Sequence, residues 1–168
     1  AITRYLAEEF RLAGTTPLER AKVDSLYCFW FSTMRNNGVS HDGDFFSIAA
    51  LKEATLCDGD GNGIANLRRP RYEDVQRLET LNEYSRAEVS LIALDYFERR
   101  LEENNNNNNG TGNNSGWLVG NSCTYVDLGL FYVLFELAEP DNVPNFDEVL
   151  GLPRLGRFVK MVSEQPHI

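Results

Sequence analysis

The chain has 168 residues, of which 42 % are hydrophobic, and its formal net charge at pH 7 is −9. This length suits one domain with a sizeable core. The acidic charge argues against a nucleic acid partner, because phosphate binding needs a basic stripe. A membrane span is also not expected, because no apolar run reaches the roughly 20 residues that cross a membrane.

The cysteines Cys28, Cys57 and Cys123 are odd in number and widely spaced. Such spacing favours neither a disulfide framework nor a metal site, so a reducing, cytoplasmic location is expected. The sequence opens at Ala1 within one helical pattern and stops soon after another. We therefore expect it to be part of a longer protein.

Helical spacing of apolar residues predicts a first helix over residues 1–12, which Gly14 ends. Thr16, Pro17 and Glu19 then give the pattern of a helix start: a capping threonine, a proline at the first helical position and a glutamate at the third. The second helix is expected to end at the Asn-Asn-Gly sequence of residues 36–38. Its apolar face carries Val23, Leu26, Tyr27, Trp30 and Met34.

Residues 37–71 read as an insertion or long loop with a short helical patch over residues 46–56. Within it, Asp58, Asp60 and Asn62 match the oxygen ligands of the first half of a calcium loop. Arg69 occupies the position where such a loop needs a bidentate glutamate. A flexible acidic turn is therefore favoured over a calcium site.

Helical spacing resumes near residue 72, and Ser85 with Glu88 forms another capping box. Residues 104–116 consist mostly of asparagine and glycine, and such a segment buries too little apolar area to offset its ordering entropy. We expect a low-complexity loop there.

Thr124 and Asp127 predict a reciprocal cap at the start of the most apolar helix. The following residues 128–137 are apolar on nearly every face, which predicts a helix surrounded by others. A last amphipathic helix is expected around residues 155–162. No segment alternates with a period of two, so the predicted fold is an all-α helical bundle.

Four pieces of the sequence, in this order, resemble a known family: residues 1–7, residues 12–17 with residues 22–24, residues 117–127, and residues 152–155. Together they resemble the C-terminal helical domain of glutathione transferases, closest to the sigma and alpha classes. The resemblance implies that residues 1–168 are this domain, with residues 1–12 ending the last helix of a preceding domain.

The resemblance also implies a two-domain homodimer. A thioredoxin-like first domain binds glutathione as co-substrate and activates its thiol, while the helical domain binds a hydrophobic electrophile. This chain then holds no catalytic residue, and the 168 residues alone are not expected to conjugate glutathione.

By analogy with the family, Tyr27, Trp30, Phe31 and Met34 are candidates for the electrophile pocket. The alternative is that they are core, because aromatic and methionine stripes at helical spacing usually are. Where the family has an acid that contacts glutathione of the other subunit, this chain has Phe31 and Ser32, which leaves only a hydrogen bond from Ser32.

The resemblance leaves two further alternatives open. Asp24 is either a polar site at the domain interface or a satisfied surface carboxylate, and the second is favoured. The whole domain could also be a non-catalytic docking module, as transferase-like domains are in elongation factor gamma subunits and aminoacyl-tRNA synthetase complexes.

Overall fold

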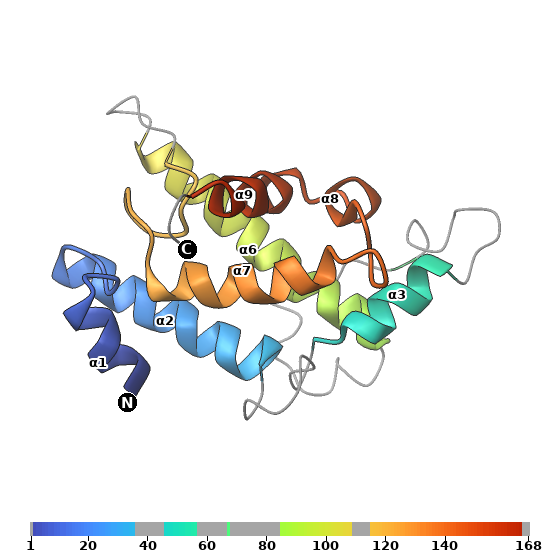
Figure 1. Cartoon of the computed structure of the whole chain (residues 1–168), viewed down its shortest axis with the longest axis horizontal. Coiled ribbons are helices and arrows are strands. Elements are labelled where there is room, and N and C mark those ends of the chain that lie inside the picture. The colour runs from blue at the N-terminus through green and yellow to red at the C-terminus, as the bar shows by residue number, and fades with distance from the viewer. Residues whose placement is uncertain (1, 36–45, 57–66, 68–84, 109–114, 166–168) are drawn as a thin grey trace.

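The computed structural model describes residues 2–35, 46–56, 67, 85–108 and 115–165, and the described part contains helices and no strand (Figure 1). The helices are α1 (Ile2–Glu9), α2 (Pro17–Met34), α3 (Ile48–Leu56), α6 (Arg86–Asn108), α7 (Tyr125–Leu137), α8 (Phe146–Val149) and α9 (Pro153–Ser163). The predicted all-α bundle is confirmed, and so are the helices predicted within residues 46–56 and 155–162.

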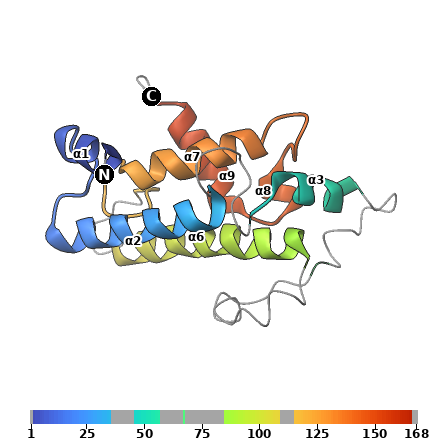
Figure 2. The ribbon, with the colours of Figure 1, turned by 90° about the horizontal axis from the view of Figure 1, so that it is seen from below.

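Helix α7 lies at the centre of the bundle. It packs against α2 on one side and α9 on the other, while α9 also contacts α6 and α8 (Figure 2). The side chains of Val126, Leu130, Leu134 and Leu137 on α7 are fully enclosed. None of the described helices is long and apolar enough to span a membrane.

A glycine allows α2 and α7 to approach closely. A Cβ atom at Gly129 would lie only 3.1 Å from Cε2 of Trp30, so the bare backbone of α7 accommodates the indole ring. Gly129 and Trp30 are thus a point of close contact between α2 and α7.

The prediction that α7 is enclosed on nearly every side is wrong for one stripe. Tyr132 and Phe135 are 47 % and 53 % exposed. A wholly apolar helix normally lies inside a protein, so an exposed aromatic stripe marks a surface with another purpose.

Both earlier capping boxes are confirmed. The Glu19 amide donates to Thr16 Oγ1 at 3.1 Å, and the Glu19 carboxylate accepts from the amides of Thr15 and Thr16. At the start of α6, the Ser85 amide donates to the Glu88 carboxylate at 2.8 Å. These bonds satisfy amides that a helix start leaves without intrahelical partners.

Helix α9 begins against a carboxylate from another helix. Glu98 of α6 accepts hydrogen bonds from the amides of Arg154 and Leu155, the latter at 2.8 Å. The Arg154 side chain also reaches Glu98 at 3.3 Å and Glu102 at 2.6 Å. Glu98 therefore joins the middle of α6 to the start of α9.

The loop predicted over residues 104–116 needs a correction, because α6 continues to Asn108. The Asn104 carboxamide donates to the carbonyls of Trp117 at 2.9 Å and Gly120 at 2.8 Å, and accepts from the Gly120 amide at 3.2 Å. Asn104 thereby ties the end of α6 to the turn that precedes α7. Residues 109–114 lie outside the described part.

Within the predicted insertion over residues 37–71, the structure describes α3 with its two preceding residues and Leu67. The calcium-loop candidates Asp58, Asp60 and Asn62 lie outside the described residues. Among the residues that are described, no group of three or more acids, cysteines or histidines could hold a metal ion.

Candidate functional site

One stripe of α2 faces the same side of the bundle as the exposed stripe of α7. Tyr27, Phe31 and Arg35 follow one another at intervals of about one helical turn, as do Tyr132 and Phe135 on the neighbouring helix. We call these five residues, together with Tyr125, the aromatic face.

A carboxylate shared by side chains of three helices marks one end of the aromatic face. Oδ1 of Asp24 accepts from Arg4 Nε of α1 at 2.5 Å and from the Tyr125 hydroxyl of α7 at 3.0 Å. A cavity of about 200 Å³ lies beside it, lined by Arg4, Asp24 and Tyr125 together with Glu8 and Arg20. Asp24 is thus a satisfied carboxylate, with its side chain 45 % exposed.

The charge state of this end follows from its contacts. The hydrogen bond from Arg4 is the main cause that lowers the pKa of Asp24. Burial, and then the neighbouring Asp24 carboxylate, raise the pKa of Tyr125. The Tyr125 hydroxyl therefore keeps its proton near neutral pH and acts as a donor.

The middle of the aromatic face is a cluster of rings. The ring centroid of Tyr27 lies 4.8 Å from that of Tyr125, 5.5 Å from that of Trp30 and 6.1 Å from that of Phe31. Such separations are typical of favourable aromatic pairs. Phe31 is 40 % exposed, so the cluster presents an aromatic edge to solvent.

The four candidate pocket residues differ in their exposure to solvent. Tyr27 and Phe31 reach the surface, whereas Trp30 and Met34 belong to the buried core. Neither buried side chain can touch a ligand without rearrangement of the core. Ser32 is exposed, and its hydroxyl donates to the Phe29 carbonyl of its own helix at 3.2 Å.

The other end of the aromatic face carries a cation. The guanidinium carbon of Arg35, the C-cap residue of α2, lies 5.1 Å from the centroid of the Tyr132 ring. Phe135 continues the surface beside Phe131, with ring centroids 5.6 Å apart. Among the described residues, no carboxylate lies within 4.0 Å of Arg35.

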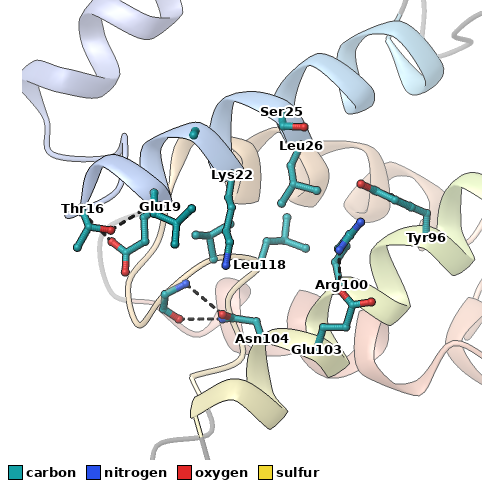
Figure 3. Close-up of a pocket in the computed structure, with 14 residues that line it drawn as sticks. Thr16, Glu19, Lys22, Ser25, Leu26, Tyr96, Arg100, Glu103, Asn104 and Leu118 are labelled. Atoms are coloured by element: carbon teal, nitrogen blue, oxygen red, sulfur yellow. Dashed lines mark hydrogen bonds and ion pairs between the residues drawn. The ribbon is translucent and has the colours of Figure 1, made fainter.

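A groove of about 500 Å³ lies on the opposite side of α2, between α2 and α6 (Figure 3). Lys22 lines it, nine positions from Phe31, which at about 100° per residue is half a turn away. Across the groove, Arg100 lies over the Tyr96 ring and pairs with Glu103 at 2.6 Å. The sequence did not predict this groove.

The cap of α7 is a buried charged group rather than a reactive one. The Asp127 carboxylate accepts from the amide and the hydroxyl of Thr124 at 2.8 and 2.5 Å, and from the Leu118 amide at 3.0 Å. The predicted capping box is therefore present, and both of its residues are buried. Burial raises the pKa of Asp127 to about 6.

Cys123, next to this cap, is not a candidate nucleophile. Burial, and secondarily the Asp127 carboxylate, raise the pKa of its thiol to about 12. A thiol must ionise to attack an electrophile, so Cys123 stays protonated and unreactive at neutral pH.

Sequence reasoning missed four residues of the aromatic face: Arg35, Tyr125, Tyr132 and Phe135. The seven-residue interval from Tyr125 to Tyr132 places these two tyrosines on one side of a helix and was the available signal. Their approach to α2 depends on how the helices cross, which helical spacing does not contain.

The helical bundle with its capped central helix has the fold of a C-terminal helical domain of the glutathione transferase type. Residues 67–168 match the family described as glutathione S-transferase, C-terminal domain, and the chain belongs to this family. A comparison with curated proteins found no match.

Solved structures support the same fold. The chain is similar to monomeric Na-GST-3, a glutathione S-transferase from the hookworm parasite Necator americanus, with 24 % identity and a TM-score of 0.51. It is also similar to NaGST-2, with 24 % identity and a TM-score of 0.52. The matches cover 97 % and 98 % of this chain but only 60 % and 61 % of the two solved chains.

Proposed function

We propose that this chain is the electrophile-binding helical part of a glutathione transferase. Glutathione binds to a thioredoxin-like domain of the same protein, which activates the thiol, and the aromatic face receives the hydrophobic electrophile. The observation that carries the proposal is the exposure of Phe31, Tyr132 and Phe135 along one side of α2 and α7. Exposed aromatic side chains gathered on one side of two adjacent helices are typical of ligand or partner sites.

A second exposed apolar surface, on α1 and the turn after it, supports a position for the thioredoxin-like domain. Ile2, Tyr5, Leu6 and Phe10 of α1 and the turn after it are all exposed. We infer that the thioredoxin-like domain covers them. Asp24, which holds α1 to α7, would then set the position of that domain beside the aromatic face.

The proposal places the reaction in the complete protein, which we expect to be a cytoplasmic homodimer. In conjugation of a chloronitrobenzene, the glutathione thiolate forms a bond to the ring carbon and chloride leaves. The aromatic face holds the ring by stacking and apolar contact. The family resemblance assigns activation of the thiol to the thioredoxin-like domain, so the 168-residue chain alone is expected not to catalyse the reaction.

The test compares four proteins in a conjugation assay with glutathione and a chloronitrobenzene: the complete protein, the 168-residue chain and two variants of the complete protein. The complete protein should turn over, and the 168-residue chain should not exceed the uncatalysed rate. In the complete protein, Phe31→Ala should raise the KM for the electrophile several-fold and leave the KM for glutathione unchanged. Val149→Ala, at an exposed apolar residue of α8, is the matched control.

Conjugation by the chain alone would refute the proposed division of labour. If Phe31→Ala and Val149→Ala change the KM for the electrophile equally, the aromatic face does not bind the electrophile. A complete protein without conjugating activity would favour the second candidate, a docking module.

One observation favours the docking candidate. Where the family has an acid that contacts glutathione, this chain has Phe31 and Ser32, and the Ser32 hydroxyl is already bonded to its own helix. A docking module would retain partner binding in a complete protein that does not bind glutathione. Calorimetric titration with glutathione distinguishes the two candidates.

A further inference from the structure

We propose that Arg35 makes the aromatic face selective for electrophiles that carry a negative charge, above all a carboxylate on an aromatic or aliphatic body. This inference rests on the proposed function and adds the substrate class. It follows from the place of one cation within an otherwise apolar surface.

Within the part of the chain that the structure describes, no carboxylate forms a direct ion pair with Arg35. In a chain with 25 acidic residues, Arg4, Arg100 and Arg154 each contact a carboxylate, whereas the described contact of Arg35 is the ring of Tyr132. Glu136 lies one turn beyond Tyr132 on α7 but not within 4.0 Å of the guanidinium. Arg35 therefore keeps its capacity to pair with an incoming anion.

The contact with the ring suits that role. A cation–π contact uses the charge of the guanidinium and not hydrogen bonds from its N–H groups, so a carboxylate can still pair with two of these donors at once. Contact with Tyr132 also restricts the Arg35 side chain before any ligand arrives, so less conformational entropy is lost on binding.

The neighbouring residues supply the apolar part of the site. Phe31 lies one turn before Arg35 on α2, and Phe135 lies nearly one turn after Tyr132 on α7. Both are exposed, so a ligand body that covers them removes apolar surface from water. Its charged group then lies within reach of Arg35.

The experiment uses two probes that share the same ring system and differ in the charge of their polar group. Binding of 2-naphthoate and of the neutral 2-naphthamide to the 168-residue chain is measured by calorimetry at low and at physiological salt. The naphthoate should bind about three- to tenfold more tightly, as expected for a partly exposed bidentate pair. Higher salt should reduce this ratio, because screening weakens the pair.

Arg35→Gln should bring the ratio close to one while naphthamide binding is retained. Arg99→Gln, at an exposed arginine of α6, is the matched control and should leave the ratio unchanged. Circular dichroism melting checks that each variant is folded.

The outcomes separate this inference from the function on which it rests. If both probes bind and the ratio of their affinities is the same in the original chain and in Arg35→Gln, Arg35 does not select for charge. The proposal that the aromatic face binds the electrophile would then still hold. If neither probe binds, or if Phe31→Ala leaves binding of both unchanged, the proposed electrophile site itself fails.

Discussion

At the scale of single residues, Asp127 has the most demanding environment that the structure describes for a charged group. Its carboxylate is fully buried, yet three hydrogen bonds from Leu118 and Thr124 and the positive end of α7 favour its charge. The same oxygens join the turn before α7 to the first residues of that helix. Asp127 is thus both a cap and a tertiary contact.

Asp127→Asn tests this double role. An amide has one acceptor oxygen in place of two, so either the Leu118 or the Thr124 amide loses its partner inside the protein. The free energy of unfolding at pH 7.5 should fall by about 1–3 kcal/mol, measured by urea titration. Asp141→Asn, at an exposed turn residue, is the control, and an equal effect of both changes would contradict the role of Asp127.

The raised pKa of Asp127 gives a second prediction, and its sign is unusual for a carboxylate. The folded chain holds this proton up to about pH 6, whereas the unfolded chain releases it near the ordinary value of 3.8. The contribution of Asp127 to stability is therefore complete below pH 3.8 and is lost as the pH rises to about 6.

Asp127→Asn removes this titration. The substitution should therefore cost about 1 kcal/mol more at pH 5 than at pH 7.5. Urea titrations of both proteins at the two pH values measure the difference. A cost that is constant, or that grows with pH, would show that burial does not dominate the pKa of this group.

At the scale of elements, Asn104 shows how a side chain in a low-complexity tract can hold a tertiary contact. Asn104→Ala removes its bonds to Trp117 and Gly120, and the free energy of unfolding should fall by about 1–2 kcal/mol. Amide hydrogen exchange at residues 118–120 should become faster. Asn106→Ala, at an exposed residue of the same tract, should change neither measurement.

Helix starts were predictable because their signals are local. A capping box needs only a few neighbouring residues, and Thr16, Ser85 and Thr124 each began a helix where the sequence placed one. The end of α6 was not predictable from composition. Asparagine is a poor helix former, but at Asn104 partners from residues 117–120 stabilise the helical end, and these partners are distant in sequence.

The candidate site was predictable only in part, for the same reason. Helical spacing identified the α2 stripe, but it could not separate the exposed Phe31 from the buried Met34. That separation depends on which side of α2 meets α7. The contact of Arg35 with Tyr132 likewise depends on how α2 packs against α7.

At the scale of the whole molecule, net charge and exposed apolar surface oppose each other. The charge of −9 keeps copies of the chain apart, while Tyr5 and Phe10 expose aromatic surface on and after α1. We expect self-association at high concentration in sedimentation velocity, and stronger association when added salt screens the charge.

Replacing Tyr5 and Phe10 together by serine should shift the sedimentation profile toward the monomer. Val149→Ser, at an exposed apolar residue of α8, is the control and should leave the association unchanged. If the chain remains a monomer at high concentration and high salt, the α1 surface does not mediate self-association.

The oxygen shared by Arg4 and Tyr125 has a mechanical consequence. Because both donors meet at Oδ1 of Asp24, a displacement of α1 pulls on the same atom that orients the Tyr125 ring against Tyr27. We therefore expect a domain that docks on α1 to influence the position of the Tyr125 ring through the Asp24 carboxylate.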